Sequence, residues 1–381
     1  MSEKKRILIL VDWFYPGYKA GGPIQSCVNI CLALKDRYDI KVITTDTDFD
    51  EKEPYQNIRS NEWVSSLDEK IAVYYFEKKS LTAGALKKLV QQTETDYIYL
   101  NHMFSPLFVI YPVWLRFLGK IKAQLVLCPR GGLYANSLAV KPFKKKIFIN
   151  VFRWLGLHKL VVFHATNERE KDAITHFFPG SLVQIANNLV KMNQPAPAFI
   201  SKEKGVLKCI YISRILPLKN LLYLLQILQN VNNKIGLTII GPVENEAYWE
   251  LCQQTIRKLP DNISVTYKGP VHNDMLVPVL QEHHLFILPT SGENFGHSIF
   301  EAFLSGIPVL ISDQTPWKNL NADKVGWDLP LDDTTKFQNA IETAAGWSQE
   351  TFNEWAKAAW QYAAKYINNP QLIEQYALLF P

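Results

Sequence analysis

A chain of 381 residues has room for two domains of roughly 150–200 residues each. Hydrophobic residues make up 48% of the chain and charged residues 20%, proportions that exclude an intrinsically disordered protein. No apolar run approaches the ~20 residues of a membrane-spanning helix, and the run that begins at Ile7 is too short for a signal peptide.

The five cysteines indicate a reducing compartment. They form no Cys-x-x-Cys pair and lie mostly in apolar segments. We therefore expect buried thiols without a disulfide or metal role, and a cytoplasmic protein.

The net charge of +5 is unevenly distributed. No acidic residue lies between Asp96 and Glu168, whereas basic residues are frequent there, most densely in KPFKKKIFINVFRWLGL. Such a segment is typical of a solvated helix face, a nucleic-acid patch or a surface that contacts anionic lipid. Because large aromatic side chains accompany the lysines, we favour an anionic membrane over nucleic acid as the partner of residues 114–159. The protein would then be peripheral on the inner face of the cytoplasmic membrane.

The first predicted strand, 7–11, leads through a loop to Gly21-Gly22-Pro23, where a helix is expected to begin. Two glycines let a ligand approach the backbone closely and leave N–H groups that point toward it. A loop that only needs positive φ would show the same pair. The segment has neither the Gly-x-Gly-x-x-Gly of dinucleotide sites nor the Gly-x4-Gly-Lys of phosphate loops.

The sequence Asp46-Thr47-Asp48 follows the second predicted strand, 40–45. An Asp-x-Asp pair can hold a metal ion beside a diphosphate. Because this one lies in an acidic stretch after an early strand, we interpret it as part of a solvated loop and expect no metal site.

Further apolar runs alternate with helical patterns, which predicts an α/β domain with a parallel, doubly wound sheet. The predicted strands are 71–76, 97–100, 124–128, 160–163 and 182–185, and the predicted helices are about 83–94, 105–118, 141–155 and 167–177.

Polar residues follow several of these strands and would line one edge of the sheet. Asn101-His102 follows one strand and Pro129-Arg130-Gly131-Gly132 follows the next. Arg130 can neutralise a phosphate or a sugar carboxylate, and the two glycines suggest a close approach of the backbone.

Residues 189–204 are interpreted as a linker, because they carry Pro195 and Pro197 among polar residues with little periodicity. The predicted organisation is therefore an N-terminal domain, 1–188, and a C-terminal domain, 205–360. The remaining residues, 361–381, are expected to form helices that cross back to the first domain.

A second series of strands and helices starts after the linker. The strand 207–213 is followed by Arg214 and Lys219, five residues apart and just before a predicted helix. Two cations at a strand end suit a diphosphate, although two solvated cations on a loop would show the same spacing.

The stretch from Leu285 to Trp317 predicts one βαβ unit. Its first strand ends in Pro-Thr-Ser-Gly, Glu293 lies on the following loop, and Glu301 lies eight residues later on the helix. Ligands of open parallel sheets bind at this edge. Two carboxylates in this arrangement can accept hydrogen bonds from two different sugar rings.

This unit resembles the Glu-x7-Glu signature of retaining GT-B glycosyltransferases of glycosyltransferase family 4, and it is most similar to members that build bacterial surface polysaccharides. The resemblance implies two Rossmann-like domains that face each other across a cleft. It also implies metal-independent transfer of a hexose from a UDP- or GDP-linked sugar to a glycan or polyprenyl-linked glycan, with retention of configuration.

Carried over to this sequence, the resemblance assigns the sugar to Glu293, Asn294, Phe295 and Gly296, and the ribose to Glu301. It assigns the donor diphosphate to Arg214, Lys219, Gly21 and Gly22, the base to the segment around Val271, and a place beside the donor sugar to His102.

In the implied mechanism, Arg214 and Lys219 stabilise the leaving diphosphate, Glu293 orients sugar hydroxyls, and no side chain is assigned as a nucleophile. Two alternatives stay open. One is a related GT-B enzyme that epimerises or hydrolyses a nucleotide sugar, and the other is a non-catalytic nucleotide-sugar-binding scaffold.

Overall fold

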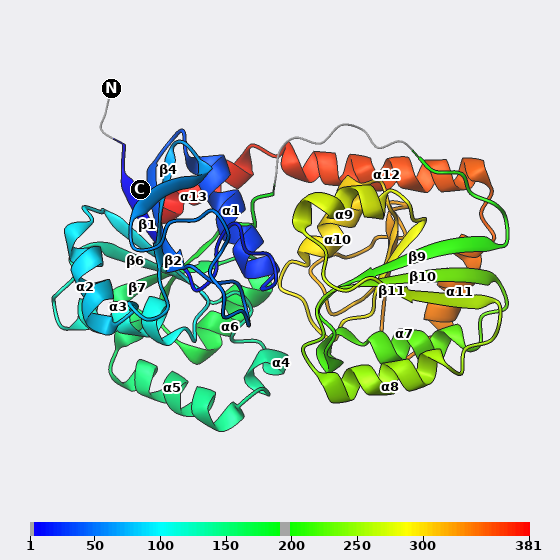
Figure 1. Cartoon of the computed structure of the whole chain (residues 1–381), viewed down its shortest axis with the longest axis horizontal. Coiled ribbons are helices and arrows are strands. Elements are labelled where there is room, and N and C mark those ends of the chain that lie inside the picture. The colour runs from blue at the N-terminus through cyan, green and yellow to red at the C-terminus, as the bar shows by residue number, and fades with distance from the viewer. Residues whose placement is uncertain (1–3, 191–198) are drawn as a thin grey trace. The chain divides into compact units, whose positions relative to one another are not determined.

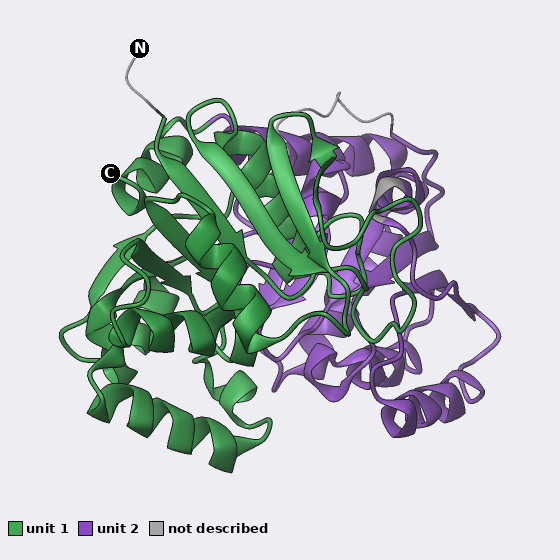
Figure 2. Cartoon of the chain, turned by 60° about the vertical axis from the view of Figure 1, so that its left-hand side comes forward, with its two compact units in different colours: residues 1–191, 369–381 green, residues 192–368 purple. Residues whose placement is uncertain are grey.

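The structure is a computed structural model that describes residues 4–190 and 199–381. The chain divides into two compact units (Figure 2). Unit 1 comprises Met1–Lys191 and Asn369–Pro381, and unit 2 comprises Met192–Asn368. Half of the expected linker 189–204, namely 191–198, lies outside the described residues. Unit 2 extends to Asn368, beyond the expected boundary at residue 360.

Unit 1 is built on an eight-stranded sheet with the order β3-β4-β2-β1-β5-β6-β7-β8 (Figure 1). All neighbouring strands are parallel except β3 and β4. The strands are β1 (Arg6–Leu10), β2 (Asp39–Thr45), β3 (Trp63–Asp68), β4 (Ile71–Phe76), β5 (Tyr97–Asn101), β6 (Gln124–Cys128), β7 (Val161–Ala165) and β8 (Leu182–Ile185).

The helices of unit 1 alternate with the parallel strands as the periodicity predicts, except that β2, β3 and β4 follow one another without a helix between them, and the last helix comes from the C-terminal end of the chain. They are α1 (Gly22–Leu34), α2 (Ala83–Gln92), the π-helical turn η1 (Pro106–Ile110), α3 (Tyr111–Phe117), α4 (Ala135–Leu138), α5 (Pro142–Trp154), the 3-10 turn η2 (Leu157–Leu160), α6 (Glu168–Phe177) and α13 (Gln371–Leu379).

Unit 2 has a parallel six-stranded sheet with the order β11-β10-β9-β12-β13-β14. Its strands are β9 (Val206–Ile212), β10 (Lys234–Ile240), β11 (Ile263–Tyr267), β12 (Leu285–Leu288), β13 (Val309–Ser312) and β14 (Gly326–Leu329). Its helices are η3 (Pro217–Lys219), α7 (Leu221–Leu228), α8 (Glu246–Ile256), α9 (Asn273–Leu280), α10 (His297–Leu304), α11 (Thr334–Ala345) and α12 (Gln349–Ile367).

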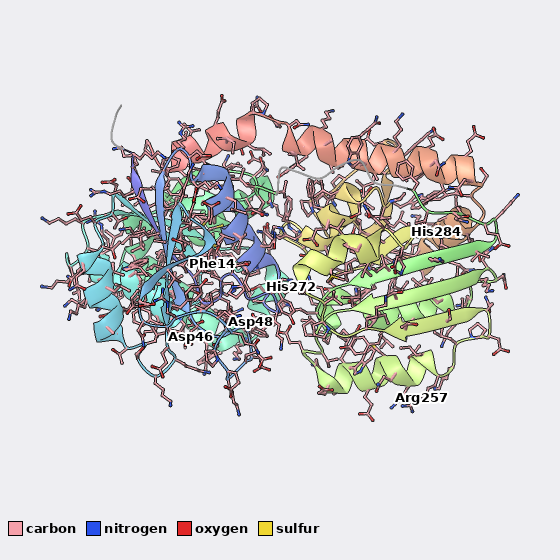
Figure 3. All side chains as sticks on the ribbon, turned by 45° about the horizontal axis from the view of Figure 1, so that its top comes forward. Phe14, Asp46, Asp48, Arg257, His272 and His284 are labelled. Carbon is pink, nitrogen blue, oxygen red and sulfur yellow. The ribbon has the colours of Figure 1, made fainter. Side chains whose placement is uncertain are left out.

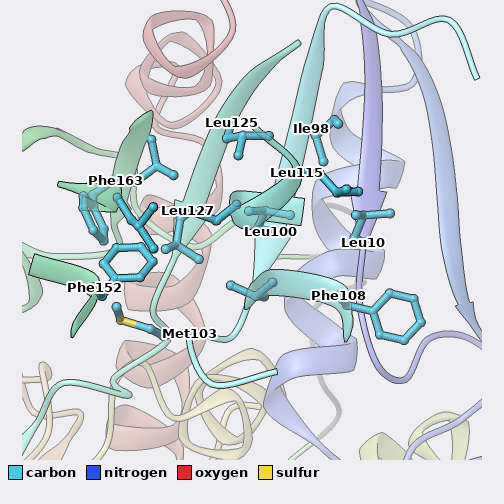
Figure 4. Close-up of a cluster of buried hydrophobic side chains, with 14 of the residues drawn as sticks. Leu10, Ile98, Leu100, Met103, Phe108, Leu115, Leu125, Leu127, Phe152 and Phe163 are labelled. Carbon is cyan, nitrogen blue, oxygen red and sulfur yellow. The ribbon is translucent and has the colours of Figure 1, made fainter. Parts of the chain in front are cut away.

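The central strands are continuous apolar runs because helices cover both faces of a parallel sheet. In unit 1, Leu10, Leu100, Leu127 and Phe163 come from four neighbouring strands and contribute to one buried cluster (Figure 4). All five cysteines are buried free thiols. The cores hold the strands in register, and this register fixes which loops meet at the carboxyl edge of each sheet.

Candidate functional site

The strand order of unit 2 reverses between β9 and β12. From β9 the sheet grows through β10 to β11 on one side, and the chain then returns to place β12, β13 and β14 on the other. Ligands of open parallel sheets bind at such a switch point, outside the carboxyl ends of the strands. The loops after β9 and β12 carry Lys219 and Glu293, so the topology brings these two predicted residues to the switch point.

Lys219 and Glu293 form an ion pair, in which the Lys219 ammonium donates to Oε1 of Glu293. Lys219 is 7% exposed and the side chain of Glu293 is 18% exposed. Water therefore screens the two charges weakly, and their attraction is stronger than that of an exposed pair.

Hydrogen bonds between the two loops hold this pair in place. The backbone N–H of Ser291 donates to the carbonyl of Leu218 (2.8 Å), and Asn220 Nδ2 donates to Ser291 Oγ (2.9 Å). The N–H of Glu293 donates to the carbonyl of Gln314 beyond β13 (3.1 Å). The site is thus positioned by backbone contacts from three strand ends before any ligand arrives.

Glu301 lies on α10, which begins after Gly296. Gly296 has a φ of 77°, a left-handed conformation that favours glycine at the start of this helix. The Glu301 carboxylate makes no hydrogen bond or ion pair within the described part of the chain, and burial raises its pKa to about 7. A partly buried carboxylate without a partner is suited to accept hydrogen bonds from ligand hydroxyls.

Phe295 contributes to this site only through its backbone. Its side chain is buried and contacts the rings of Phe300, Trp317 and Tyr366. Its carbonyl accepts a hydrogen bond from Trp317 Nε1 (2.6 Å). This aromatic cluster supports the loop that carries Glu293, and the preceding residue, Asn294, is half-buried on the same loop.

Arg214 is paired elsewhere in the structure. Its guanidinium donates to Glu244 (2.8 Å), and both side chains are about one-third exposed, at 37% and 33%. The two loops approach closely because Gly241 has no side chain, and a Cβ there would lie 2.0 Å from the Ser213 carbonyl. Val271 lies half-buried in the loop between β11 and α9.

In unit 1, Gly21 precedes the first residue of α1 and has a φ of 66°. A Cβ at Gly21 would have open space, so the backbone conformation requires the glycine and close packing does not. Gly22 is the first residue of the helix. The helix N-terminus therefore presents backbone N–H groups at the carboxyl edge of the unit 1 sheet.

Asp46 and Asp48 are labelled in Figure 3. The interpretation of Asp46-Thr47-Asp48 as a solvated loop is wrong, because Asp46 is 3% exposed and Asp48 is 7% exposed. Asp48 accepts hydrogen bonds from the N–H groups of Tyr18 (2.9 Å) and Lys19 (3.1 Å) and so anchors the loop that leads to α1. Within residues 4–190 and 199–381, no group of His, Cys, Asp and Glu side chains is arranged to hold a metal ion.

The switch point of unit 1 lies between β1 and β5, and a hydrogen bond spans it. Ser105 Oγ after β5 donates to Asp12 Oδ1 after β1 (2.8 Å), and burial raises the pKa of Asp12. His102, in the same turn as Ser105, is exposed and has a φ of 75°. Left-handed conformations of non-glycine residues are uncommon and concentrate at functional sites.

Arg130 is engaged in a polar network inside unit 1. Its Nε donates to Asn101 Oδ1 (2.8 Å), one terminal nitrogen donates to Tyr99 Oη (3.0 Å), and the other donates to Asn188 Oδ1. None of these partners is an acid, and the structure as described gives Arg130 no ion pair. The nearby carboxylate of Glu170 instead accepts from the N–H of Gly131 (2.6 Å).

Sequence patterns did not reveal Glu244, Asp12 or Glu170. Glu244 and Asp12 have partners far away along the chain, and Glu170 accepts from distant Gly131 as well as from nearby Thr166. Only the sheet order brings the distant partners together. The position of Asp12 directly after a buried strand was the one available signal.

Part of the chain matches a known family. Residues 207–345 match the family model described as "Glycosyl transferases group 1", and this segment contains Arg214, Lys219, Glu293 and Glu301. A relative from Klebsiella pneumoniae, named "Uncharacterized 41.2 kDa protein in cps region", is 20% identical over 302 residues, which are 77% of this chain and 80% of that protein.

Solved structures resemble the whole chain. HepE from Anabaena, in complex with UDP and glucose, has a TM-score of 0.71 at 16% identity, with 99% of each chain covered. TarM from S. aureus, in complex with fondaparinux, alpha-GlcNAc-glycerol and UDP, has a TM-score of 0.70 at 13% identity, again with 99% of each chain covered. The chain has the GT-B fold, and the predicted fold class is confirmed.

Proposed function

We propose that this protein is a glycosyltransferase that moves a hexose from a nucleoside diphosphate sugar to a hydroxyl of a glycan or lipid-linked glycan in bacterial polysaccharide synthesis. The observation that carries the proposal is the Lys219–Glu293 pair at the switch point of the sheet, followed eight residues later on α10 by Glu301, which has no partner in the described chain. All three residues lie inside the segment that matches group 1 glycosyltransferases.

Lys219 is the proposed contact of the donor diphosphate. Negative charge grows on the diphosphate as the glycosidic bond breaks, and a fixed cation in a poorly solvated place stabilises that charge. Arg214 is the second proposed cation. On donor binding, its guanidinium would leave Glu244 and pair with the donor phosphate. These two charges perform the task that a metal ion has in other transferases, so we propose a metal-independent reaction.

Glu293, with the backbone of Asn294, Phe295 and Gly296, is proposed to orient the hydroxyls of the hexose. Glu301 is proposed to accept hydrogen bonds from the ribose, and the segment around Val271 to bracket the base. Their placement after β12, on α10 and after β11 supports these roles, because these segments surround the carboxyl edge of one sheet.

Unit 1 is proposed to serve the acceptor and one further phosphate contact. The N–H groups at Gly21 and Gly22 are the proposed phosphate contact, and His102 and Arg130 are proposed to lie on the acceptor or sugar side. The exposed position of His102 and the absence of an acidic partner for Arg130 in the described chain support this assignment.

The proposed donor is UDP-linked or GDP-linked. HepE was solved with UDP-glucose and TarM with UDP, which supports UDP for this chain. The relative from a cps region supports polysaccharide synthesis. Retention of anomeric configuration belongs to the same proposal, and NMR analysis of the anomeric proton of the product checks it.

Calorimetric binding of UDP and GDP without metal tests the donor site. We expect the wild type to bind one nucleotide, and Glu301→Ala to bind it at least about tenfold more weakly. The exposed Glu250 on α8 provides the control, since Glu250→Ala should bind like the wild type. Failure of folded wild-type protein to bind either nucleotide would overturn the donor-site assignment.

The two alternatives give different results in a turnover assay. A scaffold binds the nucleotide sugar and releases no UDP or GDP when glycan acceptors are added. An epimerase or hydrolase consumes the nucleotide sugar without any acceptor. Acceptor-dependent release of the nucleoside diphosphate is the result expected of a transferase.

A further inference from the structure

Helix α5 has two apolar faces, and only one of them is covered by unit 1. Ile149 and Phe152 are buried in the core, and Phe148 packs edge-to-face against Phe104 with ring centroids 5.6 Å apart. The opposite face carries Phe143 and Trp154, which are 76% and 83% exposed. These exposures are the largest among the large hydrophobic residues of the described chain, and α5 lies on the outside of unit 1 (Figure 1).

The exposed apolar residues of α5 form one continuous stripe. They are Phe143, Ile147, Val151 and Trp154, at spacings of four, four and three residues. At about 100° per residue, these four side chains occupy an arc of roughly 80° on the helix. A core helix needs one such stripe, and α5 already has its own on the buried side. The outer stripe therefore has no packing role within unit 1.

Basic side chains flank the outer stripe on both sides. At about 100° per residue, Lys144 lies next to one border of the stripe, and Lys146 and Arg153 lie next to the other. All three are exposed. Lys145 alone turns inward, where its ammonium donates to the carbonyl of Ser137 (2.6 Å) and lies 4.8 Å from the Phe104 ring centroid.

The sequence between Asp96 and Glu168, which carries these cations, contains no Asp or Glu. Two more aromatic residues of this interval, Trp114 and Phe117 on α3, are 40% and 44% exposed. In the described chain no helix is long and apolar enough to cross a bilayer. Ile147 and Val151 in the middle of the stripe can neither pair with phosphate nor stack on bases, so the stripe fits a lipid surface better than a nucleic acid.

We propose that α5 lies in the interface of an anionic lipid membrane, with the outer stripe at the acyl boundary and Lys144, Lys146 and Arg153 against the lipid head groups. Buried apolar side chains and cations near anionic lipid both strengthen the binding of such a helix. The surface belongs to unit 1 and does not depend on the donor site, so this inference goes beyond the proposed function.

Sedimentation with phosphatidylcholine vesicles, with and without phosphatidylglycerol, tests the proposal. We expect the wild type to bind the mixed vesicles, less as salt is raised, and to bind phosphatidylcholine alone weakly. The double variant Phe143→Ser/Trp154→Ser should partition at least about tenfold less into mixed vesicles. The control Leu251→Ser, at a 50% exposed leucine of α8, should partition like the wild type.

A charge variant separates the two parts of the surface. The double variant Lys144→Glu/Lys146→Glu should no longer prefer vesicles with phosphatidylglycerol to vesicles without it, because the two introduced glutamates repel anionic head groups. Both double variants should keep wild-type affinity for the nucleotide, so a failed donor site and a failed membrane surface are distinguishable. Wild-type protein that sediments with neither vesicle, or a Phe143→Ser/Trp154→Ser protein that sediments like the wild type, would overturn the proposal.

Discussion

The Lys219–Glu293 pair links stability and proposed function at the scale of single residues. Lys219→Met would leave the weakly exposed Glu293 carboxylate without its cation. Breaking a largely buried pair costs about 3 kcal/mol, so we expect a loss of that order in the free energy of unfolding. Urea denaturation measures this loss, and calorimetry should show weaker binding of UDP.

A double variant shows whether the pair acts as a unit. In Lys219→Met/Glu293→Gln no charge is left unpaired, so most of the stability should return while transferase activity does not. The exposed Lys357 of α12 is the control, and Lys357→Met should change neither quantity. If the double variant loses as much stability as the two single variants together, the two side chains do not act as a coupled pair.

We expect Glu301, whose pKa burial raises to about 7, to set the pH dependence of nucleotide binding. If the ionised carboxylate accepts hydrogen bonds from the ribose, affinity should fall as the pH drops below about 7 and level off above it. Calorimetry of UDP binding between pH 5 and 8 checks this. Glu301→Gln should remove most of the dependence of UDP affinity on pH. Only the part caused by protonation of the UDP phosphate should remain.

The same group has the opposite effect on folding. An acid whose pKa rises from 4.5 in the unfolded chain to about 7 in the folded protein binds more protons when folded, so stability falls as the pH rises between these values. Glu301→Gln should therefore be more stable than the wild type at pH 8, by roughly 1–3 kcal/mol, and equally stable near pH 4.5. Equal stability at both pH values would contradict the raised pKa.

Sequence patterns located the residues of the candidate site but not their partners. The spacing of Glu293 and Glu301 follows from one local strand-loop-helix unit, so the sequence alone predicts both positions. The partner of Arg214 depends on how closely the loops after β9 and β10 approach, which the missing side chain of Gly241 permits. Asp48 is predicted to be solvated because it lies in an acidic stretch of the sequence. Its hydrogen bonds to the backbone N–H groups of Tyr18 and Lys19 cannot be recognised from that local composition.

At the scale of elements, the Asp48 carboxylate holds in place the loop that leads to α1. Asp48→Asn would lose the charge-assisted hydrogen bonds to the N–H groups of Tyr18 and Lys19. We expect a loss of about 1–3 kcal/mol in the free energy of unfolding and faster hydrogen exchange at these two amides. Asp50→Asn is the matched control, because Asp50 is exposed on the same loop. Equal effects of both substitutions would contradict the anchoring role.

Strand β3 shows where prediction of elements from the sequence fails. The predicted central strands are continuous apolar runs, whereas Trp63–Asp68 is a half-buried edge strand with polar residues at several positions. It is also antiparallel to β4, so the sequence has no crossover helix beside it that would indicate a strand. The pattern of a fully buried strand is strong in the sequence, but an edge strand is recognised only through its partner.

At the scale of the whole molecule, the end of the chain completes the core of unit 1. The sequence predicts that residues 361–381 cross back to the first domain, and the structure places residues 369–381 in unit 1. Phe380 is 2% exposed and contacts the rings of Tyr38, Tyr97 and Tyr99. The two units are therefore not consecutive halves of the sequence, and the last residues stabilise the first unit.

This arrangement predicts a selective effect of Phe380→Ala. Removing a buried phenylalanine costs about 3 kcal/mol or more, and the loss should fall on unit 1. Hydrogen exchange followed by mass spectrometry should show faster exchange in β1 and β5, with β9, β10 and β12 close to wild type. Leu378→Ala, two residues earlier on α13, is the control, because Leu378 is 63% exposed and its substitution should change exchange in neither set of strands. An equal increase of exchange in both units would show that the tail stabilises the chain as a whole and not unit 1 in particular.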